Sequence, residues 1–333
     1  MTVKLLRTVM AILATAATML TLGAVNTARA DVYTQPGGHA VNGRLWQTEC
    51  SMYSSTVVRC RTDIWATQVK YQGGHYVRVT DWAFNNLTYL PSPRGQWANN
   101  PLGKTGTWTA TDGRQWRTVC DTPETGSNAC RSYVMARVAS ATATPSGWSY
   151  SVESKWVFNN IVVFSTASRP PVHDVPPSVL ETAKLSHGGF GPLAVGASLV
   201  DLARLGYVEH NTSDVCDYYE VSDEVADLGL AIVANGHTLD VLIATTAAVE
   251  TTLGVKVGQT YTQANTAYSA GGYTWEHETK DGYQPVYVYK VVNGTREMLF
   301  LDDFEATSLP DSNTPIGMII VRQASNTLMW DGC

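Results

Sequence analysis

The sequence predicts a two-part exported protein, with all-β tandem disulfide-bonded modules followed by an α+β domain of tandem short helix plus antiparallel sheet. Three observations support this prediction. The first half contains an internal repeat, the second half alternates short helix signals with strand signals, and a proline-rich connector at 166–185 separates the two. A chain of 333 residues is long enough for two hydrophobic cores of ordinary size.

The repeat is the most specific of these signals. The segment NGRLWQTEC at 42–50 recurs as DGRQWRTVC at 112–120, and a Cys-Arg pair follows each copy at the same distance. Each copy closes with Trp-x-Phe-Asn-Asn, at 82–86 and at 156–160. Shared order and spacing predict two homologous modules, residues 31–98 and 99–165. Alternating runs predict strands in both, with Gly73-Gly74 as a hairpin turn and the paired asparagines in turns or caps.

Six cysteines follow the first thirty residues, and an even number in an exported chain predicts disulfides. Because each module holds one cysteine pair, we expect Cys50–Cys60 and Cys120–Cys130, which leaves Cys216–Cys333. A bridge between the modules is the alternative, and it requires the two modules to share an interface.

Residues 1–30 have the pattern of a signal peptide: two early basic residues, an apolar run, and Ala28-Arg29-Ala30 before the expected cleavage site at Asp31. A membrane anchor is the alternative, but threonines interrupt the run and it is short for a bilayer. We therefore expect an extracellular (secreted) or cell-envelope associated bacterial protein that makes no membrane contact after cleavage.

Charge differs between the two halves. Residues 31–165 carry 12 Lys and Arg against 8 Asp and Glu, whereas residues 166–333 carry 8 against 21. The acidic half either meets a different partner or only keeps the protein soluble. The prolines of the connector predict an extended spacer that holds the halves apart. No nucleic-acid partner is expected, since the positive balance of the first half is modest and lysine is scarce.

Tryptophan and arginine are concentrated in the first half, and both residue types are suited to ligand binding. Indole rings stack on sugars, and arginine pairs with carboxylate or phosphate. Tryptophans at matched repeat positions are expected in the core: Trp46, Trp82, Trp116 and Trp156. Unmatched tryptophans are expected at the surface and, with two matched arginines, form the candidate ligand-binding set: Trp65, Trp97, Trp108, Trp148, Arg61 and Arg131. The matched arginines are alternatively structural donors.

The acidic domain at 186–333 shows an internal repeat of its own. Ser198 is a plausible N-cap for a short helix to Leu205, and a second helix is expected near Tyr261–Tyr268. Three strands are expected with the Asn235-Gly236 hairpin turn, at 217–221, 228–234 and 238–245, and four with the Asn293-Gly294 turn, at 273–278, 285–291, 296–302 and 316–322.

Two glycine-rich segments, Gly191 to Ser198 and Gly254 to Thr260, lead into these helices. A lead of this kind, a short helix and a meander of strands, twice in tandem, resembles the repeat of β-lactamase-inhibitor-like and related small exported bacterial domains. The resemblance implies a protein-binding module with a concave sheet.

No catalytic motif, metal-ligand spacing or cofactor loop is present, so we expect no enzyme, no metal and no cofactor. Clusters of Asp and Glu at 214–227 and 302–305 leave calcium open, without the spacing of a known calcium loop. The expected function is a secreted non-enzymatic binding protein, whose N-terminal modules contact a cell-wall polysaccharide or other anionic polymer while the C-terminal domain contacts a protein. A secreted hydrolase using Asp and Glu, or a structural envelope component, are the alternatives.

Overall fold

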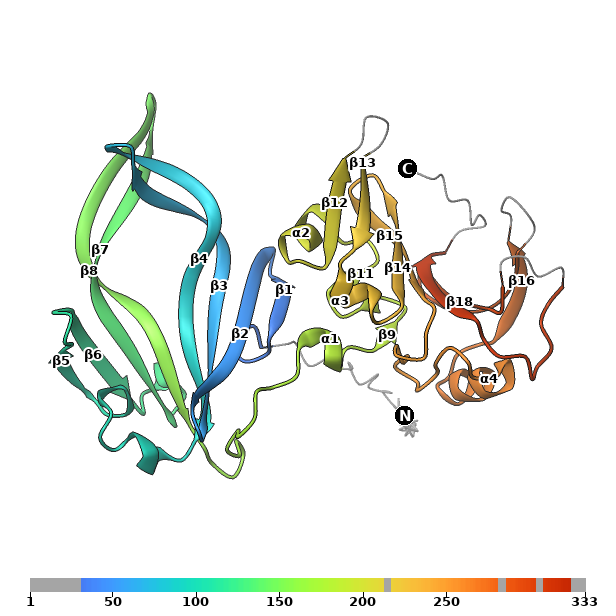
Figure 1. Cartoon of the computed structure of the whole chain (residues 1–333), viewed down its shortest axis with the longest axis horizontal. Helices are drawn as coiled ribbons and strands as arrows, with labels where there is room; N and C mark the ends of the chain where they lie inside the picture. Colours follow the sequence, from blue (N-terminus) through green and yellow to red (C-terminus); the bar gives the residue numbers. More distant parts are fainter. Residues whose placement is uncertain (1–30, 213–216, 281–285, 304–307, 325–333) are drawn as a thin grey trace, which may run out of the picture.

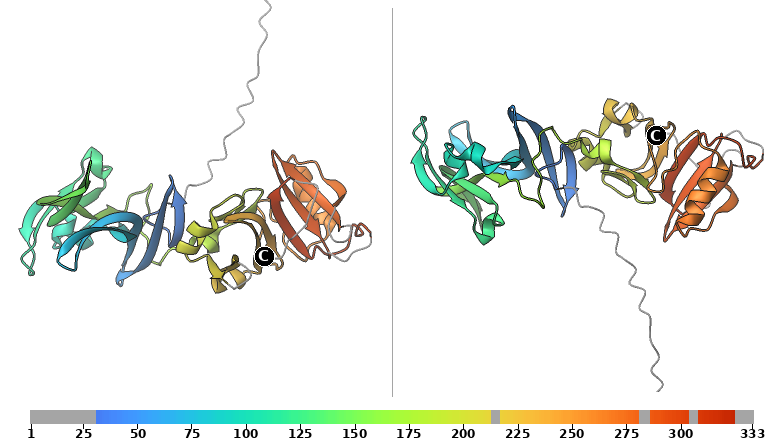
Figure 2. Two further views of the ribbon diagram at one scale, coloured as in Figure 1. Left: turned by 90° about the horizontal axis from the view of Figure 1, so that it is seen from above. Right: turned by 90° about the horizontal axis from the view of Figure 1, so that it is seen from below.

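The computed structural model describes residues 31–212, 217–280, 286–303 and 308–324. This part of the chain is mostly β, with several antiparallel sheets and a few short helices, as the sequence predicts. The molecule is elongated: the N-terminal strands form one end, and the C-terminal half, with helix α4 (Tyr261–Ala270), forms the other (Figures 1 and 2). None of the described helices is both long and apolar enough to cross a membrane.

The N-terminal modules share one sheet. In the described chain its eight strands lie in the order β1-β2-β3-β4-β8-β7-β6-β5. The first four belong to module one and the last four to module two: β1 (Gly37–Val41), β2 (Arg44–Ser54), β3 (Val57–Gln72), β4 (His75–Ser92), β5 (Gly106–Thr109), β6 (Gln115–Cys120), β7 (Ala129–Thr144) and β8 (Gly147–Phe164). All neighbouring strands are antiparallel except β4 and β8, which pair in parallel near the base of the two long hairpins (Figure 1).

Strand register is the same in the two modules, which supports their origin by duplication. Cys50 lies opposite Cys60 on β2 and β3, and Cys120 lies opposite Cys130 on β6 and β7. Both pairs form disulfides, so these two predictions are confirmed. The third predicted bridge, Cys216–Cys333, lies outside the described residues, as does the signal peptide at 1–30.

The paired asparagines are not in turns, so that prediction is wrong. Asn85-Asn86 and Asn159-Asn160 lie inside the long strands β4 and β8. Each pair sits at a β-bulge, where the register shifts between Thr62 and Asp63 in module one and between Ser132 and Tyr133 in module two. A bulge leaves one residue unpaired within a strand, which suits asparagine for the same reason that a turn does.

Matched residues of the two modules face opposite sides of the sheet. In the β4–β8 pairing Thr88 lies beside Ile161, although its repeat counterpart is Val162. A one-residue offset reverses the face of every side chain. Each disulfide therefore packs into a separate small core: Cys60 with Leu90 and Val172 on one face, and Cys130 with Val162 and Trp97 on the other. We call the first of these the connector face.

The connector does not hold the halves apart, and that expectation is wrong. Val172 donates its backbone N–H to Pro91 O at 2.8 Å, so the connector lies against the sheet. Beyond it, α1 (Val179–Thr182) lies against β1, with Val179 N bonded to Pro36 O at 2.9 Å. Leu45 belongs to the same buried cluster as the C-terminal core, and Trp65 and Trp82 pack against it. Prolines stiffen an extended segment but do not prevent docking.

The C-terminal half holds short hairpins and one larger sheet. Its remaining elements are β9 (Leu185–Ser186), β10 (Gly189–Phe190), β11 (Leu193–Ala194), α2 (Leu199–Arg204), β12 (Val208–Thr212), β13 (Asp217–Val221), α3 (Asp223–Ala226), β14 (Leu230–Asn235), β15 (Thr238–Ala244), β16 (Glu276–Lys280), β17 (Val286–Asn293), β18 (Arg296–Leu301) and β19 (Met318–Gln323). Among the described residues six strands form the antiparallel sheet β14-β15-β19-β18-β17-β16.

Both predicted helices of this half are confirmed, and their caps explain their starts. Ser198 accepts a hydrogen bond from Asp201 N at the start of α2, and Thr260 accepts one from Gln263 N at the start of α4. The two Asn-Gly turns also form the expected hairpins, β14–β15 and β17–β18. Strand β12 and helix α3 were not expected, because Glu209-His210-Asn211 lacks apolar alternation and α3 is a single turn.

Candidate functional site

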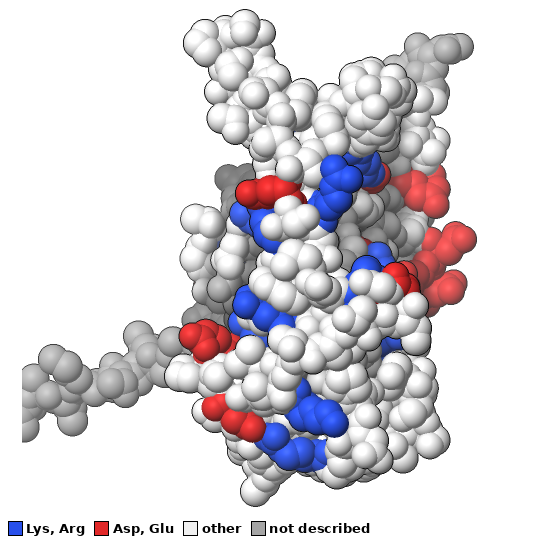
Figure 3. All heavy atoms as spheres, turned by 90° about the vertical axis from the view of Figure 1, so that its left-hand side faces the viewer, with Lys and Arg blue, Asp and Glu red and all other residues white. Residues whose placement is uncertain are grey.

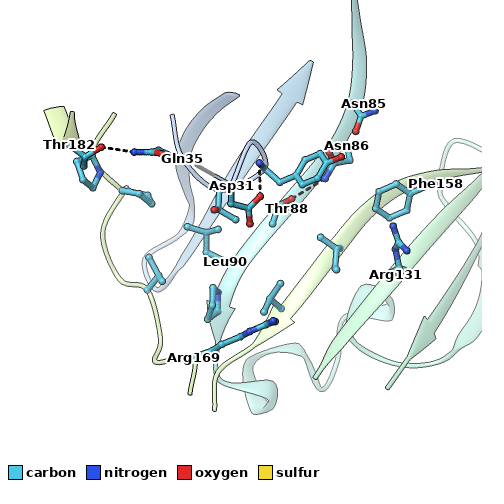
Figure 4. A pocket seen from close by; sticks show the side chains of 18 of the residues that line it. Asp31, Gln35, Asn85, Asn86, Thr88, Leu90, Arg131, Phe158, Arg169 and Thr182 are labelled. Carbon is cyan, nitrogen blue, oxygen red and sulfur yellow. Dashed lines mark hydrogen bonds between the residues drawn. The ribbon is translucent and has the colours of Figure 1, made fainter. Parts of the chain in front are cut away.

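A pocket of about 1150 Å³ lies on the connector face, beside the line where the two modules meet (Figure 4). Four parts of the chain line it: the first residues of the described chain, the bases of β4 and β8, the segment from Glu124 to Arg131 at the start of β7, and the connector. Its volume is at the upper end of the range for small-molecule pockets, about 300–1000 Å³. Several lining residues are exposed, namely Asp31, Tyr33, Glu124 and Arg169, so the pocket opens to solvent. We call it the connector pocket.

The N-terminal wall of the pocket is fixed by hydrogen bonds to the sheet. Thr48 Oγ1 donates to Val32 O at 2.5 Å, and Gln35 Nε2 donates to Thr182 Oγ1 at 2.7 Å (Figure 4). His39 lies next to this segment with its Nε2 at 2.9 Å from Gln35 O, and burial lowers the pKa of its imidazole. The wall is therefore held in place before any ligand arrives.

Arg131 is one of two arginines that line the pocket, with Arg169. The strand β7 places it beside Phe158 of β8, with the guanidinium carbon 4.4 Å from the ring centroid (Figure 4). Its Nη1 donates to Glu124 O at 3.2 Å, whereas its buried Nε has no hydrogen-bond partner in the described chain. No described carboxylate forms an ion pair with it. Stacking on an aromatic ring orients a guanidinium and leaves its N–H edge for an anion.

The matched arginine of module one has a different environment. Arg61 lies over Phe84 at 4.9 Å, which repeats the arrangement in module two. However, Arg61 also forms an ion pair with Asp63 at 2.7 Å, and the position that corresponds to Asp63 is Tyr133 in module two. Arg61 also faces the side of the sheet away from the pocket, since it pairs with Leu87. The two copies thus differ: Arg61 is paired with a carboxylate, whereas Arg131 has none among the described residues and can bind an anion.

Polar side chains near Arg131 offer further contacts. Asn86 Nδ2 donates to Thr88 Oγ1 at 2.9 Å, while its buried Oδ1 has no partner among the described residues. Arg169 contributes a second positive charge from the connector (Figure 4). Leu90 and Ile161 also line the pocket and supply apolar surface. The pocket can therefore hold a ligand that combines an anionic group with apolar or hydroxylated surface.

The candidate tryptophans do not gather at this pocket, and one of them is not at the surface. Trp97 is 2% exposed, packs in the core behind the second disulfide and donates Nε1–H to Ser92 Oγ, so the surface expectation is wrong for it. Burial there follows from the 3-10 helix η1 (Arg94–Trp97), which folds the indole onto Tyr89. Trp65 is half-buried against the C-terminal half, with Arg204 over its ring at 5.3 Å.

The other two candidate tryptophans lie elsewhere in the sheet. Trp148 is 45% exposed near the end of the β7–β8 hairpin, with Arg78 over its ring at 3.7 Å. Trp108 stacks on Trp116 at 5.8 Å. The matched tryptophans expected in the core are only half-buried: Trp46, Trp82, Trp116 and Trp156.

No group of three or more potential metal ligands is found among the described residues. Asp31 and Glu124 are the carboxylates of the pocket, and Asp31 Oδ1 accepts a hydrogen bond from Tyr33 N at 3.0 Å. The acidic clusters in the C-terminal half are only partly described, since residues 213–216 and 304–307 fall outside.

Comparison of the chain with protein-family models, curated proteins and solved structures found no match. The resemblance of the C-terminal repeat to β-lactamase-inhibitor-like domains therefore remains a prediction. The two disulfides indicate an oxidising compartment.

Of the pocket residues, the sequence pointed only to Arg131. The sequence pattern places Phe158 in the motif that closes module two and Asn86 in a turn. It predicts a spacer for the connector residues, so none of these residues was expected at a site. Alignment of the two repeats holds one signal that would have singled out the site: Asp63 beside Arg61 is replaced by Tyr133 beside Arg131.

Proposed function

We propose that this protein is a secreted or envelope-associated, non-enzymatic binding protein, and that its connector pocket holds an anionic segment of a cell-wall or matrix polymer. The observation that carries the proposal is the state of Arg131. It is oriented by Phe158, faces an open pocket and has no carboxylate partner in the described chain. An arginine in this state costs free energy by partial desolvation unless a ligand supplies the anion.

The pocket also fits a polymer segment better than a small metabolite. Its volume exceeds that of most small-molecule sites, and its rim is exposed over several strands. The oxidising compartment indicated by the disulfides is where wall and matrix polymers occur. The acidic C-terminal half would then be free to bind a protein partner. Its 21 Asp and Glu against 8 Lys and Arg favour a partner with a basic surface.

Cosedimentation of residues 31–333 with insoluble cell wall and insoluble polygalacturonate, at low and high salt, tests this function. We expect the protein to pellet at low salt and less at high salt. Arg131→Ala should raise the apparent Kd, taken from the pelleted fraction over a range of polymer concentrations, at least about tenfold, since a charge-assisted hydrogen bond is worth about 1.5–3 kcal/mol.

Arg61→Ala is the matched control, because it removes the same residue type over the same ring type on the other face. It should pellet like the parent protein. Equal pelleting of Arg131→Ala and the parent would show that the pocket does not hold the polymer. Release of soluble oligosaccharides with new reducing ends would instead favour the hydrolase alternative, with Asp31 and Glu124 as its carboxylates.

A further inference from the structure

A row of alternating arginines and aromatic rings leads away from the connector pocket across module two. It consists of Arg131, Phe158, Tyr133, Arg117 and Trp156, and we call it the arginine ladder. Phe158 lies 5.8 Å from Tyr133, and the Arg117 guanidinium carbon lies 5.0 Å from the rings of both Tyr133 and Trp156. Strand pairing places Arg117 opposite Tyr133 and Tyr133 opposite Phe158, so the row crosses β6, β7 and β8 on the connector face.

Arg117 is in the same state as Arg131. Its Nε is buried and lacks a hydrogen-bond partner within the described ranges, and none of the carboxylates described there forms an ion pair with it. Its guanidinium carbon lies over the rings of both Tyr133 and Trp156, which orients the guanidinium. An arginine whose role was only structural would be expected to donate to a carbonyl or a carboxylate.

Module one has no such row. The position that corresponds to Arg117 is Gln47, the position of Tyr133 is Asp63, and Trp82, which corresponds to Trp156, packs against the C-terminal half. The ladder is therefore not a requirement of the module fold. It is present in the copy whose face stays open and absent from the copy whose aromatic residues are used for docking.

Spacing and charge indicate what the ladder binds. Arg131 and Arg117 occupy diagonal positions on neighbouring strands, which places their Cβ atoms roughly 7–8 Å apart. Figure 3 shows Lys and Arg side chains recurring down this end of the molecule, several of them next to Asp or Glu side chains. The ladder thus presents two anion-binding groups at a fixed distance, separated by rings.

We propose that the arginine ladder is a second subsite for the same ligand, so that the protein recognises a linear acidic polysaccharide whose carboxylates bind Arg131 and Arg117 in turn. This inference rests on the proposed function of the connector pocket and names its substrate class. A polysaccharide is favoured over a nucleic acid because the Arg117 guanidinium already lies over the rings of Tyr133 and Trp156, where a base would have to stack.

Chain-length dependence tests the second subsite. Binding of residues 31–333 to galacturonic acid and to its dimer, tetramer and octamer is measured by calorimetry, with teichoic acid and single-stranded DNA as competitors. We expect affinity to rise at least about tenfold between the monomer and the longer oligomers in the parent protein. Arg117→Met, which keeps apolar contact with the rings, should abolish this rise.

Two controls separate a binding role from a folding role. Gln47→Ala changes the matched position of module one, and Arg44→Ala removes one positive charge from an exposed site in that module. Both should keep the chain-length dependence, and all variants should share one circular dichroism spectrum.

The outcomes distinguish the two proposals. If Arg131→Ala has no effect on any oligomer, the pocket proposal fails and the ladder falls with it. If Arg131→Ala weakens every oligomer but Arg117→Met still gains affinity with length, only the ladder proposal is overturned. Stronger binding of teichoic acid or DNA than of the octamer would overturn the assignment to an acidic polysaccharide.

Discussion

Tyr207 shows how one side chain connects the two halves. Its hydroxyl donates to Gly38 O at 2.9 Å and accepts from Gly38 N at 2.6 Å, which satisfies both backbone groups of a residue on β1. Burial raises the pKa of this phenol from 10.0 to about 12. Ionisation would remove the donated hydrogen bond and place a charge in the interface.

We predict that Tyr207→Phe lowers the free energy of unfolding by about 1–3 kcal/mol, because it leaves a buried N–H and C=O without partners. A phenol with a raised pKa contributes stability that is fully present below pH 10 and is lost as the pH rises toward 12. The stability difference between the parent protein and Tyr207→Phe should therefore narrow over that range. Urea unfolding at pH 9 and pH 11 measures it. A stability difference that stays constant between pH 9 and pH 11 would show that the ionisation of Tyr207 is not coupled to folding. Burial also raises the pKa of Tyr268 to about 12, but this contribution is the same in both proteins and cancels in the difference.

The pair Arg61 and Arg131 shows what could and could not be predicted at the residue scale. Matched spacing found both arginines and both neighbouring phenylalanines. It could not show that the sheet faces alternate between modules, because that depends on a one-residue offset in the β4–β8 pairing. The sequence does show that Asp63 near Arg61 is replaced by Tyr133 near Arg131, but not that Arg131 faces a pocket.

At the scale of elements, the two disulfides connect directly opposed residues of neighbouring strands. Each joins strands that enter a small core, and Cys60 and Cys130 are both fully buried. A small core supplies limited hydrophobic stabilisation, so a covalent constraint on the unfolded chain carries more weight there.

We predict that Cys50→Ala with Cys60→Ala, and separately Cys120→Ala with Cys130→Ala, each lower the free energy of unfolding by about 2–4 kcal/mol. The two double variants should differ little, because both bridges close loops with a sequence separation of 10. Guanidinium unfolding under non-reducing conditions provides the measurement. A loss below about 1 kcal/mol in either variant would show that the strand pairing alone holds that module together.

Turns were the best predicted elements and strand lengths the worst. Gly73-Gly74 and the two Asn-Gly pairs lie at hairpin turns as expected, since a two-residue turn requires a backbone conformation that few residues adopt. The strands β7 and β8 extend much further than the expected runs. Residues 138–152 are small, uncharged or aromatic rather than strictly alternating, and pairing with the partner strand maintains them as β structure.

At the scale of the whole molecule, the connector and the interface make the two halves a continuous body. Pocket, connector and interface share residues: Val172 packs on the sheet beside the pocket, and α1 docks on β1 at its edge. Composition predicted two parts with different charge. Docking could not be predicted, because it depends on Trp65 and Trp82, whose spacing fits a ligand surface equally well.

Gly38 gives a direct test of that docking. A Cβ at this position would lie 2.9 Å from Leu205 Cβ and 3.0 Å from Tyr207 Cε2, so even alanine would push the halves apart. Gly95 has open space around its Cβ position and is the matched control. We predict that Gly38→Ala splits a single calorimetric unfolding transition into two and enlarges the radius of gyration in X-ray scattering, whereas Gly95→Ala changes neither. A single transition retained in Gly38→Ala would mean that the connector alone couples the halves. In that case a polymer bound in the connector pocket, which the connector lines, should raise the temperature of that single transition.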